Sequence, residues 1–194
     1  MRSDSVSSIA KYLHLTDPYI YPKICNDPLD PDWINLIRLC SGTDRNLFHI
    51  RHLFVALHKE EIVGILCAIP CGSELNFIER FRENLPKEFL TRLTPVIEGY
   101  FDPLLSESRS YEGYNITNVC VDAAHRKNGF GKLLLARCVE EYGESLLHLD
   151  VIADNEAAIR LYQQFGFNVS EEYYGYSGDD TKLPCYHMIR TPRK

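Results

Sequence analysis

A strand-like segment that runs directly into a helix beginning with glycines is the feature that most constrains this chain. The junction between the two reads VDAAHRKNGFGKLLL over residues 121–135. Apolar residues recur at helical spacing from residue 129 to residue 142. The N–H groups in the first turn of such a helix have no partner within the helix. The junction is therefore a place where the backbone can hold a phosphate group.

The spacing of the glycines excludes two nucleotide-binding motifs. A dinucleotide fingerprint needs glycine at position 134 and a Walker A loop needs Ser or Thr at position 133, and both positions are leucine. What remains is an Arg-x-x-Gly-x-Gly pattern, in which Gly129 and Gly131 let a ligand approach the main chain. The positive charge around it suits a pyrophosphate and comes from Arg126, Lys127 and Lys132. A plain helix start with a flexible turn is the alternative.

The second half of the chain resembles the GNAT superfamily of N-acetyltransferases. Residues 121–131 match the family's Val-x-x-x-x-Arg-x-x-Gly-x-Gly segment, which binds the pyrophosphate of acetyl-coenzyme A. A second family signature is present as Asn155, Ala158, Leu161, Tyr162, Gly166 and Phe167. The resemblance covers roughly residues 114–190, whereas the N-terminal third matches in the order of its elements alone.

The order of the predicted elements is mixed α/β. Strand-like patterns occur at 8–14, twice within 52–70, and at 114–122, 145–153, 167–177 and 183–190. Helix-like patterns occur once within 16–31 and at 32–40, 129–142 and 155–166, with a helical insertion at 74–105 that Pro86 and Pro95 interrupt. The resemblance implies a single N-acetyltransferase domain over residues 1–194, whose mixed, mostly antiparallel sheet of about seven strands is flanked by helices.

The resemblance also implies where acetyl-coenzyme A binds as co-substrate. In the family, the strands that correspond to 114–122 and 145–153 are splayed apart, and the acyl-pantetheine arm lies between them. The implied coenzyme-binding residues are Val119, Cys120, Val121, Arg126, Lys127, Asn128, Gly129, Phe130, Gly131, Lys132, Asn155 and Tyr162. From the sequence alone, Asn155 also suits a helix cap.

Two residues are expected to carry the chemistry. The resemblance places Tyr162 near the thioester sulfur, where a phenol of pKa about 10 can protonate a thiolate of pKa about 8.5. The alternative is a tyrosine packed in the core. Asp150 lies where several relatives carry a glutamate that helps to deprotonate the incoming amine, although Asp is the shorter side chain. Glu112 or a water molecule are the rival bases.

We expect direct transfer of the acetyl group to a primary amine of a small molecule. No cysteine stands at a motif position that would make it a nucleophile. The alternatives are acetylation of a protein or peptide N-terminus or a lysine, and a non-catalytic acyl-coenzyme A sensor. The resemblance places the acceptor near the early helices and the loop 177–184. Its expected surroundings are Tyr19, Tyr21, Trp33, Asp179 and Asp180, and the insertion contributes to the pocket or to a homodimer contact.

Composition narrows the class of partner. A net charge of -6 over 194 residues speaks against nucleic acid, whose binding needs clustered Lys and Arg. The sequence shows neither a signal-like start nor an apolar run of membrane-spanning length, so we expect a cytoplasmic protein and no membrane. The seven cysteines include no Cys-x-x-Cys pair and are expected to be reduced, and no metal is expected, His49 and His52 included.

Overall fold

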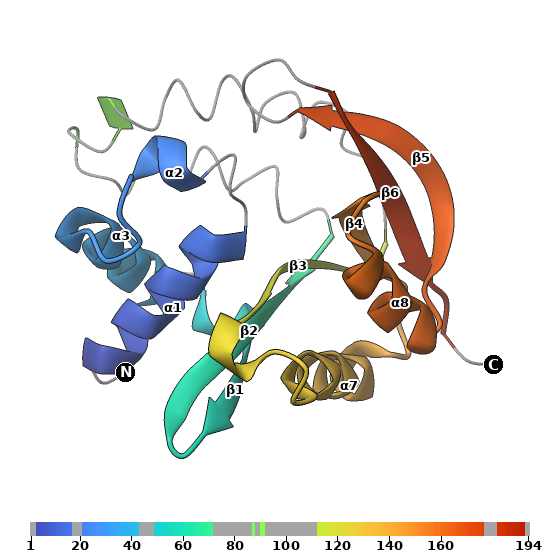
Figure 1. Ribbon diagram of the computed structural model, residues 1–194, viewed down its shortest axis with the longest axis horizontal. Helices are drawn as coiled ribbons and strands as arrows, with labels where there is room; N and C mark the ends of the chain where they lie inside the picture. Colours follow the sequence, from blue (N-terminus) through green and yellow to red (C-terminus); the bar gives the residue numbers. More distant parts are fainter. Residues whose placement is uncertain are drawn as a thin grey trace.

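The computed structural model describes residues 3–16, 21–42, 49–71, 112–176 and 182–192, together with residues 87, 90 and 91. Within these residues, six strands form one mixed sheet in the order β1-β2-β3-β4-β6-β5 (Figure 1). Neighbours are antiparallel except for the parallel pair β3 and β4. The strands are β1 (Leu53–His58), β2 (Glu61–Pro70), β3 (Tyr114–Val121), β4 (Leu147–Ile152), β5 (Asn168–Tyr176) and β6 (Lys182–Arg190).

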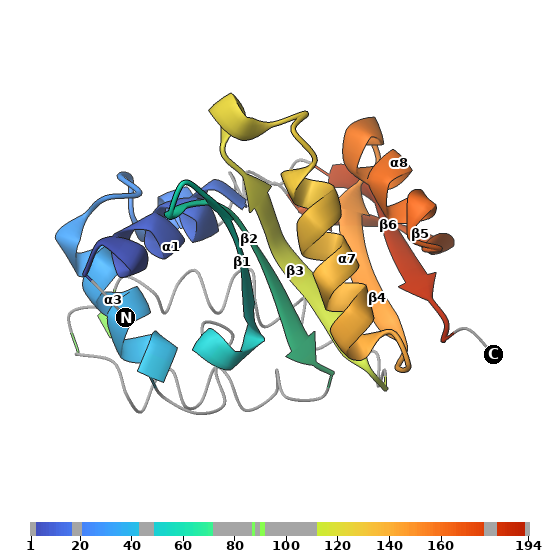
Figure 2. The same ribbon diagram turned by 90° about the horizontal axis from the view of Figure 1, so that it is seen from below.

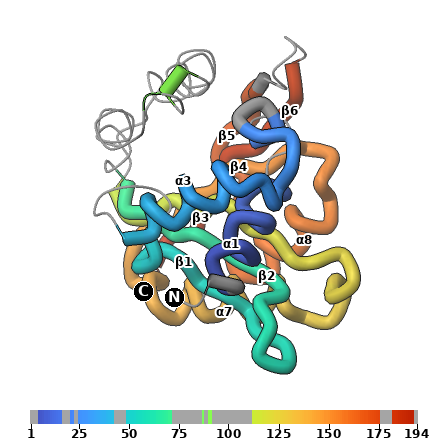
Figure 3. The backbone as a smooth tube through the Cα atoms, turned by 90° about the vertical axis from the view of Figure 1, so that its left-hand side faces the viewer, coloured from blue at the N-terminus to red at the C-terminus, as the bar shows by residue number. Residues whose placement is uncertain are grey.

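Helices cover both faces of the sheet. One face carries α1 (Ser3–Thr16), α2 (Tyr21–Ile24) and α3 (Pro31–Gly42), and the other carries α7 (Phe130–Tyr142) and α8 (Glu156–Gln164). Figure 2 shows α7 running alongside the strands, where it contacts β1, β2 and β3, and Figure 3 shows α1 and α3 in front of the strands that they cover. Two short 3₁₀ turns, η1 (Ile50–His52) and η4 (Ala123–His125), precede β1 and follow β3. This arrangement confirms the predicted α/β class.

The first expected strand, residues 8–14, is wrong, because this segment belongs to the helix α1. Val6, Ile9, Ala10 and Leu13 recur at the i, i+3, i+4 and i+7 positions of one helical face, and all four are buried. That face packs on β2, β3 and α3. The helix accounts for a sheet of six strands rather than about seven.

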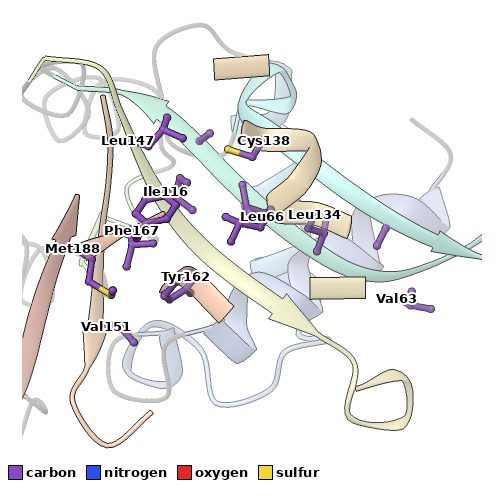
Figure 4. Packing of buried hydrophobic residues seen from close by; sticks show 14 residues of the cluster. Val63, Leu66, Ile116, Leu134, Cys138, Leu147, Val151, Tyr162, Phe167 and Met188 are labelled. Atoms are coloured by element: carbon purple, nitrogen blue, oxygen red, sulfur yellow. The ribbon is translucent and has the colours of Figure 1, made fainter. Parts of the chain in front are cut away.

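The two faces have separate cores. The first core joins α1 and α3 to β2 and β3, and the indole Nε1 of Trp33 donates a hydrogen bond to the Ala10 carbonyl at 2.8 Å. The second core lies between the sheet and the helices α7 and α8, as Figure 4 shows. Its fully buried members include Leu66, Leu135, Leu147 and Phe167.

A bulge in β3 changes the face to which its side chains point. Thr117 pairs with Cys67 and Cys120 pairs with Ile65, so β3 has one residue more than β2 between these two pairs. As a result, Ile116 belongs to the second core whereas Cys120 belongs to the first, although both have even numbers.

Asn118 takes the unusual backbone conformation that the bulge requires. Its φ of 52° lies in the left-handed region, where Asn is tolerated better than most residues. Its side-chain Oδ1 lies 2.8 Å from the Thr16 hydroxyl and accepts a hydrogen bond from the Tyr21 hydroxyl at 3.1 Å. The end of α1 and the start of α2 therefore hold the bulge.

The remaining predicted elements outside the insertion are confirmed with small shifts at their ends. The insertion 74–105 lies outside the described residues except for residues 87, 90 and 91, which are helical. All seven cysteines are described, and each is a free thiol. No helix among the described residues has the length and apolar character needed to cross a membrane.

We expect Asn118→Ala to lower the free energy of unfolding by about 2–3 kcal/mol, because it adds left-handed strain to the loss of the Asn118 hydrogen bonds. Asn118→Gly should cost less, since glycine adopts the same φ freely and loses the hydrogen bonds alone. Urea denaturation of the three proteins checks the ranking. Equal stability of the alanine and glycine variants would contradict the argument from backbone strain.

Candidate active site

The parallel strands β3 and β4 separate after a short paired stretch. Tyr114 pairs with Leu147 and Asn115 pairs with His148, and no later pair joins the two described strands. Farther along, β3 stays paired with β2 up to Val121, and β4 stays paired with β6 up to Ile152. The facing edges of β3 and β4 are thus left unjoined, as expected for the splayed strands.

The start of α7 lies at the open end of this separation. A Cβ atom added at Gly131 would lie 3.4 Å from Leu161 Cδ2 and 3.8 Å from Val121 Cγ2. The first turn of α7 is therefore next to the last residue of β3 and next to α8. The described strand, loop and helix occur in the order that the sequence predicts.

The N-terminus of α7 has no side-chain cap. Its N-cap residue is Gly129, which has a φ of 85° and open space where a Cβ would stand. The first backbone bond of the helix runs from the Leu133 N–H to the Gly129 carbonyl at 2.9 Å. The N–H groups of Phe130, Gly131 and Lys132 precede that bond, so they have no acceptor within the helix. Together with the helix dipole, they favour a negatively charged ligand.

Exposed basic residues surround the same helix start. Arg126, Lys127 and Lys132 are all exposed, as is Asn128 beside them. Lys127 has a φ of 64°, which turns the chain sharply. Arg126 is partly engaged already, because its Nε donates a hydrogen bond to the Val121 carbonyl at 3.1 Å. The loop thus brings positive charge to the uncapped N–H groups.

The side chain of Asp122 connects this loop to α1 through hydrogen bonds. Its carboxylate accepts hydrogen bonds from Lys11 Nζ at 3.0 Å, from the Tyr12 hydroxyl at 3.3 Å and from the Ala124 N–H at 2.9 Å. The Lys11 ammonium, then the Ala124 N–H, lower the pKa of Asp122 to about 2. Asp122 was not among the predicted site residues, although an aspartate directly after a strand is a common cap for the turn that follows.

Tyr162 is buried in the second core. It is 7% exposed, and its ring lies 6.1 Å from that of Phe167 in an edge-to-face arrangement. Figure 4 shows it beside Val151 of β4. Burial raises the pKa of Tyr162 to about 12, so the phenol keeps its proton at every physiological pH. The structure therefore satisfies one requirement of a general acid and also agrees with the alternative of a core tyrosine.

Asp150 lies on the opposite face of β4 from Tyr162. Leu147, Leu149 and Val151 point into the second core, so the alternation of the strand turns Asp150 toward the face that carries α1. Its side chain is 46% exposed, and its Oδ1 lies 2.9 Å from Nδ1 of His187 on β6. His187 was not among the predicted residues.

The rival base Glu112 lies at the closed end of the separation. Its carbonyl bonds Nε2 of His148 at 2.9 Å, and His148 belongs to the last pair that joins β3 and β4. Asp150 is two residues farther along β4, where the strands have parted. This placement favours Asp150 over Glu112 as the carboxylate nearest to the unjoined edges.

The other predicted coenzyme-binding residues lie in different surroundings. Asn155 is the N-cap of α8, and its side chain accepts from the Ala158 N–H at 3.2 Å. Val119 and Val121 are half-buried against the second core. Cys120 is buried in the first core, and burial raises the pKa of its thiol, which disfavours the nucleophilic thiolate.

The surroundings expected for the acceptor are described in part. Tyr19, Asp179 and Asp180 lie outside the described residues. Tyr21 and Trp33 are buried in the first core on the face that carries α1, and their role as pocket walls stays a prediction. No group of three His, Cys, Asp or Glu side chains suited to a metal ion occurs in the part of the chain that the structure describes.

Comparison with known proteins identifies the family. The model of the acetyltransferase (GNAT) family matches residues 17–167, which is more than half of the chain. The solved structure of an N-acetyltransferase from Staphylococcus aureus Mu50 has the same fold, with a TM-score of 0.74 at 20% identity over 97% of this chain and 96% of that chain. A second solved acetyltransferase gives a TM-score of 0.65 at 19% identity over 98% of both chains.

The curated relatives match through shorter segments. The [ribosomal protein bS18]-alanine N-acetyltransferase of Escherichia coli K12 is 38% identical over 63 residues, which are 29% of this chain and 43% of that protein. The L-methionine sulfoximine/L-methionine sulfone acetyltransferase of Salmonella typhimurium LT2 is 31% identical over 83 residues, which are 40% of this chain and 47% of that protein. The chain thus spans less than half the length of the curated relatives that it matches.

The family match over residues 17–167, the shared fold and the uncapped helix beside two parted strands lead to one conclusion: this chain belongs to the GNAT family of acetyltransferases.

Proposed function

We propose that this protein transfers an acetyl group from acetyl-coenzyme A to a primary amine. The observation that carries the proposal is the unjoined edge between β3 and β4, with the uncapped start of α7 at its open end. A ligand with an anionic group and a long, hydrogen-bonding arm fits both features at once. Acetyl-coenzyme A has this shape, since a pyrophosphate lies at one end of its pantetheine arm.

The loop and the strand would divide the binding of that ligand between them. The N–H groups of Phe130, Gly131 and Lys132, with the three exposed bases, would hold the pyrophosphate. The main chain of Val119, Cys120 and Val121 would bond the pantetheine arm as an added strand, because the β4 edge does not pair with these residues. Asn155 would reach the arm in addition to its role as a helix cap.

The chemistry follows from the two faces of the sheet. The nitrogen of an unprotonated amine attacks the thioester carbon, a C–N bond forms and the C–S bond breaks. Tyr162, on the face of α7 and α8, would give its proton to the departing thiolate. Asp150, on the face of α1, would take a proton from the ammonium, directly or through water. The amine therefore approaches from one face and the thiolate is protonated from the other.

The face that carries α1 would receive the acceptor, since Asp150 is exposed there. We propose a small-molecule primary amine, for which the carboxylate offers a counter-charge to the ammonium. The relatives named above act on a ribosomal protein alanine in one case and on L-methionine derivatives in the other. A peptide N-terminus is therefore the second candidate, and the assays below distinguish the two.

We further propose that residues 1–194 form a single domain in a cytoplasmic protein, that the insertion makes a homodimer contact, and that the activity depends on neither metal nor nucleic acid.

We expect wild-type protein to release free thiol from acetyl-coenzyme A with at least one member of a panel of polyamines, aminoglycosides, amino acids and peptides with free N-termini. Tyr162→Phe should lower kcat about 100-fold, because it removes the general acid. Tyr142→Phe is the matched control, because Tyr142 is the last residue of α7, at the opposite end of this helix from its glycine start. Its ring stacks on that of Tyr114, with centroids 4.1 Å apart. Binding of acetyl-coenzyme A without thiol release across the panel would favour the sensor alternative.

The raised pKa of Tyr162 predicts the alkaline side of the pH profile. A general acid is lost as pH rises through its pKa, and burial moves that loss from about 10, the ordinary tyrosine value, to about 12. We therefore expect kcat at saturating substrates to show no fall due to Tyr162 up to about pH 10. A fall near neutral pH that disappears in Tyr162→Phe would contradict this assignment.

Gly131→Val should weaken the binding of acetyl-coenzyme A at least tenfold while the protein stays folded. The added side chain would stand beside the N–H groups that hold the pyrophosphate, and each lost charge-assisted bond costs about 1.5–3 kcal/mol. The added Cβ would lie 3.4 Å from Leu161 and 3.8 Å from Val121, which are ordinary contact distances, so we expect the variant to fold. Gly42→Val, with open space around it on α3, is the control, and isothermal titration calorimetry measures both. Unchanged affinity in Gly131→Val would remove the proposed phosphate site.

A further inference from the structure

We propose that His187 is a positioning residue that fixes the orientation of the Asp150 carboxylate for the incoming amine, an inference that rests on the proposed function. Asp150 and His187 are direct cross-strand partners in the antiparallel pair β4 and β6. Their side chains lie on the same face, and Oδ1 of Asp150 is 2.9 Å from Nδ1 of His187. Residues paired in this way keep their spacing through the backbone ladder on both sides.

The two members of this pair differ in their exposure. The His187 side chain is 3% exposed, whereas the Asp150 side chain is 46% exposed. A substrate in solution therefore reaches the carboxylate and not the imidazole. His187 touches no substrate atom in this arrangement, and its effect passes through Asp150.

The chemistry of the pair fixes the direction of the hydrogen bond. An ionised carboxylate accepts hydrogen bonds and has none to donate, so Nδ1 of His187 must carry the proton that joins the two groups. This bond occupies Oδ1 and leaves Oδ2 for an ammonium or a water molecule. An aspartate has fewer rotatable bonds than a glutamate, and the bond to His187 restricts them further. The short side chain thus acts from one defined position.

A second histidine supports His187 from the neighbouring strand. The rings of His148 and His187 are stacked, with centroids 5.6 Å apart and planes at 23°. Nε2 of His148 in turn bonds the Glu112 carbonyl at 2.9 Å. Burial lowers the pKa of His148, which favours the neutral form of this ring beside His187. The stacked pair restrains the imidazole that holds Asp150.

The test separates orientation from simple stability through a conservative variant. The side-chain amide of Asn matches the Nδ1–H donor of His, whereas Leu fills the space without a donor. We expect His187→Leu to lower kcat/KM for the best acceptor about 100-fold, with the KM for acetyl-coenzyme A changed less than about twofold. His187→Asn should recover most of that loss. Met188→Leu, next in β6 but in the second core, is the control and should behave as wild type.

Two further measurements decide whether the effect passes through Asp150. The double variant Asp150→Asn with His187→Leu should be no slower than Asp150→Asn alone, because both changes break one unit. Nitrogen-15 NMR of labelled histidine should show Nδ1 of His187 protonated at neutral pH, with a resonance that shifts in Asp150→Asn.

The role of His187 is rejected if folded His187→Leu keeps the wild-type kcat/KM or if His187→Asn restores none of the lost activity. It is also rejected if the losses of the two single variants add in the double variant, or if Nδ1 of His187 is unprotonated. A wild-type protein that acetylates no amine in the panel overturns the proposed function instead. In that case the NMR result still supports or rejects the oriented pair, since it needs no turnover.

Discussion

The divergence of β3 from β4 is the constraint on which the rest of the structure depends. Two parallel strands that stay side by side would satisfy each other's backbone groups and leave no edge for a ligand. Here the shared ladder ends at Asn115 and His148. The bulge at Asn118 lies just beyond that point, and bulges bend a strand and increase its twist. β3 can therefore stay bonded to β2 while it leaves β4.

The bulge also decides which side chains lie next to the unjoined edge. It turns Cys120 into the first core and leaves Val119 and Val121 against the second core. The apolar environment beside Tyr162 is thereby continuous from α8 to β3. A phenol in such surroundings keeps its proton, and under the proposed mechanism a thiolate formed in the same apolar surroundings would also have a raised proton affinity, because burial disfavours its charged form too. Under the proposed mechanism, the exposed carboxylate of Asp150 on the opposite face would have the reverse requirement, because it would have to accept a proton from an ammonium in solvent.

Local sequence patterns predicted those parts of the molecule whose cause is local. The helix at 129–142 follows from its spacing of apolar residues, and its glycine start from the need for positive φ at Gly129. Residues 8–14 alone do not show the helix α1, because the repeat that Ile9 and Leu13 share begins outside them at Val6. Interactions between residues that are far apart in the sequence produce no local sequence pattern from which they could be predicted. Thr16 and Asn118 are 102 positions apart, and Asp150 and His187 are 37 apart.

The helical conformation of residues 3–16 matters because α1 contacts the β3 segment at two points. Lys11 and Tyr12 bond Asp122 at the end of the strand, and Thr16 contacts Asn118 at the bulge. The helix thus holds β3 at its bulge and just beyond its last residue, in the region where β3 no longer pairs with β4. A strand at this place would have to join an edge of the sheet, and it would leave both Asp122 and Asn118 without these partners.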